Sequence, residues 1–576
     1  MERIVREASL WLDQEGAIID PNDGTEYAQS SPRFAAPAAI LLYYDRIADL
    51  EDKVYACMDH CTSALAHGEA EAPDFWMREL MTAFFCLKSR APESKIQRWS
   101  AHLISVDSEK TYWKVCSRGI DIKTLHNWVV YSSAGEWMRH QAGLGPSDSS
   151  IPDEPFLWGR KFFDHYMDAQ RFHFTSDGMY RDPGAPVTYD YATRLQIATA
   201  LKFGYDGHLR ADLDELLRRG GLTMLLYMGP DGQCPYGGRS NQFNFNEAII
   251  AALCEVEASR YKESDPFLAG VFRRQAAKSA AMIAEWVTAD DPARYCKHWF
   301  SLDDNFGADE YAKLSCYGLL TASFLGLAIL FADEEIVETI CPAETGGYVL
   351  ESDPSFHKVF ASCGGTQVQL DTRADLKYDA TGLGRFARQG VPIALGLNMP
   401  MAPQPHYHLP AQYLHDRAVA IGPSWQDGNG EWISLANLSE ELEMNTVVAE
   451  ESGAQVKWSV IYRSQRHQAT VTEKYRLTDS ELNIRASILL DSMIKPRMKF
   501  SVPLLATDGR NQSITKSGVK ELTLTFCDSV LRVLYNARLQ ASLVDEHCAN
   551  RNGIYQTLHI ACEQPEVDVT LQLLSL

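Results

Sequence analysis

The sequence predicts a protein of two parts: an α/α toroid, incomplete or of about six helical hairpins, over residues 1–340, then an antiparallel β-sandwich over residues 341–576. Three observations predict this fold. Apolar residues recur at helical spacing before residue 340 and alternate with polar residues after residue 345. Between the two patterns lies the stretch CPAETGGYV, residues 341–349. With 576 residues, 45% of them hydrophobic, the chain can bury large cores.

Helical periodicity fills the first part. Phe245, Ile249, Ala252, Leu253 and Val256, for example, lie on one helical stripe. Some segments are amphipathic and others are apolar nearly all round, and a helix of the second kind must be buried on every side. Two concentric layers of helices would satisfy both patterns. The segments include 33–49, 51–67, 74–89, 120–141, 153–170, 189–203, 208–227, 242–261, 266–288 and 310–332.

The second part alternates with a period of two. Val456, Trp458, Val460 and Tyr462 are separated by Lys457 and other residues that would face the opposite side of a strand. The same alternation recurs over 482–490, 522–526 and 567–573, with turn-forming stretches such as GPSWQDGNGEW between the strands. Many half-buried strands in succession predict an antiparallel sandwich.

Charge and composition narrow the function. The chain carries 54 Lys and Arg against 76 Asp and Glu, a net charge of −22, without the basic footprint of a nucleic-acid binder. An anionic ligand would therefore need a local basic pocket. Leu319–Phe331 is the most apolar stretch but is shorter than the ~20 residues of a membrane span, and we interpret it as a buried helix. We expect no membrane partner and no nucleic-acid partner.

Targeting and redox signals are also informative. The N-terminal residues MERIVREASLWLDQEG contain no apolar stretch of signal-peptide length, which predicts a cytoplasmic protein. The 13 cysteines are scattered and form no CxxC pair, as expected of reduced, mostly buried thiols. Oligomeric state has no signal in the sequence.

Three local stretches contain candidate functional residues. They are His126-Asn127-Trp128 in LHNWVVYSSAGEW, Asp177-Gly178-Met179-Tyr180 running on to Arg194, and YGGRSNQFNFNEA at 236–248. With these stretches the chain resembles polysaccharide lyases that pair an α/α toroid with a C-terminal sandwich, among them the heparinase II/III-like, alginate, chondroitin and xanthan lyases. The resemblance implies β-elimination beside a uronic acid, with an acidic oligosaccharide as partner. Because no export signal is evident, we expect the enzyme to work on imported oligosaccharides in an exo-acting mode.

Such elimination requires particular residue types. The substrate carboxylate must be neutralised by donors before its α-proton becomes acidic enough to remove, and a Tyr or His then takes the proton. We assign neutralisation to Asn127 and Arg239, supported by Asn241, and proton transfer to Tyr189. Tyr191, Tyr236 and His126 are further candidates. Where the family has a histidine in its aspartate-glycine loop, this chain has Arg181 and Asp182.

Other residues complete the expected substrate-binding set: Trp128, Tyr191, Arg181, Tyr311, His406 and His408. His406 and His408, in PQPHYHLP, would lie on one side of an extended segment and line the cleft. A His-x-His pair is also half of a zinc site, but no third ligand is evident, so we expect no metal and no cofactor.

Structural readings compete with these assignments. Asn127 can simply cap its helix, and Asn241, Asn244 and Asn246 can be turn or cap residues. Glu247 can be a buried partner of Arg239. Two other functions also remain: a glycoside hydrolase on the same scaffold, and a carbohydrate-binding protein without activity. The hydrolase would draw its carboxylates from Asp177, Asp190, Glu247, Asp309 and Glu310.

Overall fold

The computed structural model describes residues 1–116, 121–124, 126–145, 158–439, 442–492, 495–536 and 539–576. These residues form two compact units. The helical unit comprises Met1–Thr223, Phe243–Tyr295 and Tyr311–Thr339. The sheet unit comprises Met224–Gln242, Cys296–Glu310 and Ile340–Leu576. Two segments from the helical part of the sequence thus group with the sheets, which the sequence did not predict: 224–242, which includes the last turn of the helix that ends at Tyr227, and 296–310.

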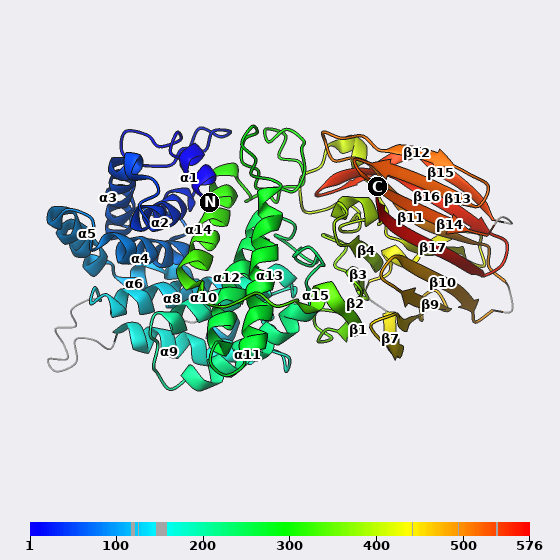
Figure 1. Cartoon of the computed structure of the whole chain (residues 1–576), viewed down its shortest axis with the longest axis horizontal. Helices are drawn as coiled ribbons and strands as arrows, with labels where there is room; N and C mark the ends of the chain where they lie inside the picture. The colour runs from blue at the N-terminus through cyan, green and yellow to red at the C-terminus, as the bar shows by residue number, and fades with distance from the viewer. Residues whose placement is uncertain (117–120, 125, 146–157, 440–441, 493–494, 537–538) are drawn as a thin grey trace. The chain divides into compact units, whose positions relative to one another are not determined.

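Helices precede strands along the chain, as predicted (Figure 1). The predicted helices 120–141 and 153–170 begin in part outside the described residues, and their described helical portions begin at Asn127 and Trp158. The helices are α1 (Glu2–Ala8), α2 (Ser30–Tyr43), α3 (Glu51–His67), α4 (Trp76–Leu87), α5 (Glu93–Ser105), α6 (Ser108–Thr111), α7 (Trp113–Cys116), α8 (Asn127–Gln141), α9 (Trp158–Gln170), α10 (Val187–Lys202), α11 (Arg210–Tyr227), α12 (Asn244–Tyr261), α13 (Pro266–Ala284), α14 (Leu314–Phe331) and α15 (Pro342–Thr345).

Within the described residues, six helices of the helical unit form a closed inner ring. Helix α2 contacts α4, and the contacts continue through α8, α10, α12 and α14 back to α2. These helices are buried over most of their length. A second layer lies outside them: α3 packs on α2, α9 on α8, α13 on α12 and α1 on α14. The predicted concentric layers are confirmed, and the toroid is complete.

The N-terminal turns of the inner helices meet at one end of this ring. Three contacts join neighbouring turns: Ser30 Oγ to Ser315 Oγ at 2.8 Å, Asn246 Nδ2 to Thr188 Oγ1 at 3.5 Å, and the Phe75 ring to the Tyr131 ring at 4.9 Å. Each helix N-terminus carries a partial positive charge. Several such termini at one mouth favour an anionic group there.

Helix α14 is the apolar stretch noted above. By length and composition it could cross a membrane, but 83% of it is buried, and it closes the inner ring between α12 and α2. A helix enclosed on all sides by other helices needs apolar residues all round. The interpretation of Leu319–Phe331 as part of a buried helix is therefore confirmed.

The sheet unit contains three antiparallel sheets in the part of the chain that is described. Their strand orders are β1-β2-β3-β4, β12-β13-β14-β17-β10-β9-β8-β7 and β15-β16-β11-β5-β6. Side chains from all three sheets share one large apolar core. The strands are β1 (Gly346–Glu351), β2 (Lys358–Cys363), β3 (Thr366–Asp371), β4 (Gly382–Arg388), β5 (Gly422–Gln426), β6 (Trp432–Ser434), β7 (Leu442–Glu451), β8 (Val456–Ser464), β9 (Ala469–Leu477), β10 (Glu481–Leu490), β11 (Met498–Thr507), β12 (Ile514–Ser517), β13 (Glu521–Phe526), β14 (Ser529–Tyr535), β15 (Gln540–Asn550), β16 (Gly553–Cys562) and β17 (Glu566–Ser575).

The predicted alternation matches the burial of the strands. Along β8, Val456, Trp458, Val460 and Tyr462 are buried while the residues between them are more exposed. The strands β10, β13 and β17 alternate in the same way. The antiparallel sandwich predicted from the period of two is confirmed.

A carboxyl group in this core predicts a pH dependence of stability. Glu473 on β9 is fully buried, and its Oε2 accepts a hydrogen bond from Tyr475 at 2.8 Å. Burial raises its pKa from 4.5 to about 7. Because the folded state holds this proton more tightly, the stability it contributes is complete below pH 4.5 and declines as pH rises through 7.

We expect the free energy of unfolding of the wild-type protein to fall by on the order of 3 kcal/mol through this group between pH 4.5 and 8. Glu473→Gln, which cannot ionise, should remove that part of the decline. Urea unfolding followed by a sheet-unit probe at pH 5 and pH 8 measures it, with Glu521→Gln, at an exposed position on β13, as control. Equal declines in the wild type and Glu473→Gln would contradict the prediction.

Candidate active site

Three polar residues meet at the first turn of α8 in the helical unit. Asn127 is buried, and both its backbone N–H and its Nδ2 donate to Asp182 Oδ1, at 3.2 and 2.9 Å. Its Nδ2 also lies 3.2 Å from His126 Nδ1. The Nδ2 group thus lies within reach of both neighbours, whereas no described residue supplies a hydrogen-bond partner to the buried Asn127 Oδ1. We call His126, Asn127 and Asp182 the α8 cluster, and its amide carbonyl is ready to accept a hydrogen bond from a ligand.

The aspartate-glycine loop holds Asp182 in this position. Gly178 has a φ of +82°, and a Cβ there would lie 2.2 Å from the backbone nitrogen of Gly220 on α11. Only glycine permits that approach. A little further on, Tyr180 N–H donates to Asp190 Oδ1 at 2.8 Å. The sequence pointed to this loop but not to Asp182 as the partner of Asn127.

Tyr189 lies in the first turn of α10 and is partly exposed. It is within electrostatic range of Tyr131 on α8, a buried tyrosine that the sequence did not single out. Tyr131 lies beside two arginines, Arg78, whose Cζ is 5.9 Å from its ring, and Arg33. Burial raises the pKa of Tyr131, and the two guanidinium groups oppose that rise. A tyrosine with two neighbouring arginines thus lies inside the ring, although burial still outweighs their effect on its pKa and Arg78 also pairs with Glu79 at 2.5 Å. The sequence did not single out Arg33 or Arg78.

Aromatic rings connect these groups. Trp128 is partly exposed, with Lys114 Nζ 4.3 Å from its ring, Phe75 at 5.7 Å and His126 at 6.3 Å. Phe75 also contacts Tyr131. The candidates Trp128 and His126 are thus brought together with Asn127.

The other candidates of the helical unit take structural positions. Tyr191 is buried, and its hydroxyl lies 3.2 Å from Thr188 Oγ1 one turn earlier. Arg181 is exposed and donates to backbone carbonyls in 172–173. Tyr311, 39% exposed, lies 6.3 Å from the Tyr317 ring. Among the tyrosines of α10, Tyr189 is the more accessible.

In the sheet unit, side chains of β3 and β4 hold the loop that carries Arg239. Gln369 Nε2 donates to the Tyr236 carbonyl at 2.7 Å, and Arg385 Nη1 donates to the Cys234 carbonyl at 2.7 Å. Asp379 Oδ2 accepts from the Gly238 N–H at 3.2 Å. Polar residues at buried strand positions, such as Gln369 and Arg385, indicate that a hydrogen-bond partner exists. They do not indicate which residue that partner is.

The loop conformation is strained. Ser240 and Gln242 have φ values of 60° and 67°, a region that side-chain-bearing residues rarely occupy. Asn241 donates from Nδ2 to the Gly238 carbonyl, so its side chain stabilises the turn in which it lies. Tyr236 is fully buried, and burial followed by the charges of Asp371 and Asp379 raises its pKa well above the usual range. That environment favours Tyr189 over Tyr236 as a base.

Arg239 itself is partly exposed and lies within electrostatic range of Tyr378, another tyrosine that the sequence did not single out. The ring of His406 is 5.7 Å from the ring of Tyr378. Arg551 acts on the same phenol and donates to Asp309 Oδ1 at 2.8 Å. The predicted residues Arg239 and His406 are therefore brought together around Tyr378, and we call these three the Tyr378 cluster.

This cluster gives a prediction that needs no substrate. Burial and Asp309 raise the pKa of Tyr378, while Arg239 opposes the rise. Removing that cation in Arg239→Ala should raise the pKa of Tyr378 further, and Arg239→Lys should not. NMR titration of 13Cζ-labelled tyrosine, assigned with Tyr378→Phe, measures it, and Arg373→Ala at an exposed site serves as control. An unchanged titration in Arg239→Ala would show that the two groups are not coupled.

The two predicted sandwich histidines flank a buried ring. His406 and His408 are exposed on either side of Tyr407, and the His408 N–H donates to the Ala308 carbonyl at 2.8 Å. In the described ranges, no three His, Cys, Asp or Glu side chains lie close enough to hold a metal ion. The residues around this pair therefore do not supply the missing zinc ligands.

The carboxylates of the hydrolase alternative are mostly engaged. Asp190 is buried and receives Arg194 Nε and Nη2 at 2.9 and 2.8 Å. Asp309 is buried against Arg551. A carboxylate that is already bonded to a guanidinium is less free to contact a substrate. In the helical unit Glu247 is fully buried and Asp177 accepts from Thr175, and in the sheet unit Glu310 is exposed.

Comparison with known proteins gives the fold. No protein-family model and no curated protein matches the sequence. Solved structures match nearly the whole chain. A heparinase III has a TM-score of 0.51 and 8% identity, over 99% of this chain and 84% of that chain. The chondroitin AC lyase of Streptomyces coelicolor A3, in complex with chondroitin sulphate, has a TM-score of 0.51 and 11% identity, over 99% of this chain and 78% of that chain.

The chain has the fold of these polysaccharide lyases. The likeness concerns the succession of a helical toroid and antiparallel sheets, as the sequence predicted. At such low identity it assigns no role to any single residue. The polysaccharide lyase fold is thus established. The groups that could carry out a reaction are those of the α8 cluster and the Tyr378 cluster.

Proposed function

We propose that this protein is a polysaccharide lyase that cleaves a glycosidic bond next to a uronic acid by β-elimination, acting on acidic oligosaccharides. One observation carries the proposal. The α8 cluster, Tyr189 and Trp128 lie at the end of the ring where the inner helices begin, and those termini favour an anion. A uronate carboxylate is such an anion. The fold shared with the two lyases supports the same reaction class.

Within the α8 cluster, His126 is the donor that can neutralise that carboxylate. With His126 Nδ1 accepting from Asn127 Nδ2, the ring hydrogen lies on Nε2, which becomes a donor toward the substrate. Asn127 Oδ1 can accept a hydrogen bond from a neighbouring sugar hydroxyl. It can also accept one from the substrate carboxyl group once that group is protonated. Asp182 keeps the Asn127 amide in place. Stabilising the negative charge that develops on the carboxylate lowers the barrier to proton removal.

Tyr189 then serves as proton carrier. Its phenolate would take the proton α to the carboxylate, electrons would move to form the double bond, and the glycosidic C–O bond would break. The phenol can return the proton to the departing oxygen. Arg239, in the strained loop of the sheet unit, has a guanidinium that suits bidentate contact with a carboxylate, and we propose that it binds one there.

The test is the appearance of ultraviolet absorbance from an unsaturated uronate. Purified protein is offered heparan, chondroitin, alginate and xanthan, together with their short oligosaccharides. We expect absorbance to rise with at least one substrate, in step with new reducing ends. New reducing ends without absorbance would indicate hydrolysis and contradict the proposal. Binding of these sugars without any turnover would instead indicate a carbohydrate-binding protein.

A further inference from the structure

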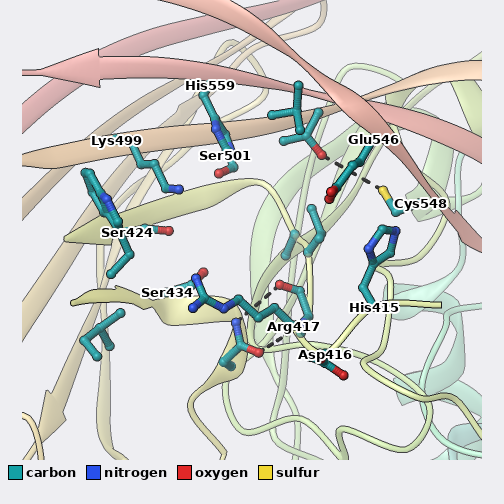
Figure 2. A pocket seen from close by; sticks show the side chains of 18 of the residues that line it. His415, Asp416, Arg417, Ser424, Ser434, Lys499, Ser501, Glu546, Cys548 and His559 are labelled. Atoms are coloured by element: carbon teal, nitrogen blue, oxygen red, sulfur yellow. Dashed lines mark hydrogen bonds between the residues drawn. The ribbon is translucent and has the colours of Figure 1, made fainter. Parts of the chain in front are cut away.

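A second polar site lies in the sheet unit, away from every residue assigned above. The five-stranded sheet β15-β16-β11-β5-β6 turns one face to the apolar core, through residues such as Phe500 on β11 and Ile560 on β16. Its opposite face bears a hollow of about 440 Å³ (Figure 2). That volume falls within the range of ~300–1,000 Å³ typical of small-molecule sites.

The strand register builds the floor of this hollow, which we call the sheet hollow. Ser501 pairs with His559, Lys499 pairs with Ser424, and Ser424 pairs with Ser434. The described chain supplies no hydrogen-bond partner to the three serine hydroxyls. Small hydroxylated residues in neighbouring strands leave space above the sheet and line it with donors and acceptors.

Two cations face this space from different elements. Lys499 comes from β11, with its Nζ 4.6 Å from the ring of Trp432 on β6, and Arg417 comes from the loop above the sheet. Asn437 Oδ1 fixes that loop by accepting from the Ala418 N–H at 2.8 Å. Neither cation makes an ion pair within the described residues. Two carboxylates, Asp416 and Glu546, line the same hollow, so its positive charge is confined to the part that Lys499 and Arg417 occupy.

The two cations lower the pKa of neighbouring groups. Burial and then Lys499 lower the pKa of His559 to about 4, so its imidazole is neutral at neutral pH and can donate or accept a hydrogen bond. Burial and then Arg417 lower the pKa of Lys499. Positive charges that oppose one another in this way are stabilised by an anion between them.

The hollow continues beyond β6. A second cavity of about 460 Å³ shares Arg417, Trp432 and Ser434 with the first and adds Arg466. The two cavities adjoin at these shared residues, which include the aromatic ring of Trp432. Each has the volume of a small-molecule site and exceeds what a single small ion fills.

We propose that the sheet hollow is a non-catalytic binding site for a carboxylated sugar unit of an oligosaccharide. Lys499 and Arg417 would bind the carboxylate, and Trp432 would pack against the ring. The serines, His559 and Glu546 would bind its hydroxyls. Glu546 distinguishes this ligand from a bare anion, which its carboxylate would repel, because sugar hydroxyls can donate to it. The choice of a uronate as the ligand of the sheet hollow rests on the proposed function.

The test measures binding apart from cleavage. Isothermal titration calorimetry is run with hexasaccharides from heparan, chondroitin and alginate, and with the same sugars after reduction of their carboxyl groups to alcohols. Lys499→Ala/Arg417→Ala and Trp432→Ala should each weaken binding of a carboxylated hexasaccharide at least tenfold. Lys499→Arg should bind as the wild type does, as should Lys516→Ala, an exposed site on β12. Carboxyl-reduced sugars should bind no more weakly to the double variant than to the wild type.

The outcomes separate this site from the proposed reaction. Absorbance produced from a disaccharide should be unchanged in Lys499→Ala/Arg417→Ala. If no sugar is cleaved but hexasaccharide binding depends on Lys499 and Arg417, the site stands and the lyase reaction is wrong. If the wild type binds none of the hexasaccharides, or the double variant binds them equally well, the site is wrong. Inorganic phosphate competing at equal concentration would also overturn it, by showing a general anion site.

Discussion

Tyr189→Phe should reduce kcat/KM for formation of the unsaturated product by ~10²–10⁴-fold, the usual contribution of a positioned acid or base. The substitution removes only the hydroxyl, so the first turn of α10 and the contact region with Tyr131 should persist. The loss should appear mainly in kcat, because a proton carrier acts in the transition state. Absorbance assays on the best substrate of the panel measure the effect.

A matched substitution separates chemistry from folding. Tyr205 lies just beyond the opposite end of α10, where its hydroxyl donates to Asp164. Tyr205→Phe should lower thermal stability and leave kcat within a few-fold. A Tyr189→Phe protein that retains wild-type kcat would exclude Tyr189 as the base, and Tyr378→Phe would then be the next variant to assay.

The second large effect is expected for Asn127→Ala. Loss of the amide removes an acceptor for the substrate and frees Asp182, whose carboxylate would then repel an anionic sugar. It also removes the Nδ2 contact that keeps the His126 hydrogen on Nε2, the donor to the developing negative charge, and loss of one such donor costs on the order of 10²–10³-fold in kcat. We expect that loss in kcat/KM, with weaker binding of the substrate contributing to it.

Asn244 provides the control because it stands at the same place on another inner helix. It is buried, begins α12 and donates from Nδ2 to the Arg294 carbonyl at 2.7 Å. Asn244→Ala should lower the melting temperature about as much as Asn127→Ala does, yet change kcat/KM less than tenfold. Equal activity losses in the two variants would mean that Asn127 acts only by stabilising its helix.

Local patterns in the sequence predicted the fold well. The stripe of Phe245 and Val256 and the alternation of Val456 and Trp458 are set by which face of one element is buried, and that is readable within a few turns. Closure of the ring is different. It depends on α14 meeting α2 across nearly 300 residues, through contacts such as Ser30 to Ser315 at a separation of 285. Nothing local encodes that pairing.

In the candidate sites, too, single residues could be predicted from local sequence, but their partners could not. Asn127, His126 and Arg239 could be selected because each lies in a loop that opens a helix or bends sharply. Asp182 and Tyr378 were missed as partners, since their roles arise only when a separate loop is brought beside them. Arg33 and Arg78 lie in helices that read as plain core, where a charged residue among apolar neighbours was the only available signal.

The segments 224–242 and 296–310 have a consequence for how the sheet unit is made. During synthesis the Cys234 and Tyr236 carbonyls leave the ribosome well before their partners Arg385 and Gln369, at separations of 151 and 133 residues. The loop must therefore remain without these partners while the rest of the toroid, from α12 to α14, is synthesised. A shortened gene that starts at residue 341 would leave Arg385 and Gln369 buried without these acceptors, so β3 and β4 need the middle of the chain as well as their own sequence.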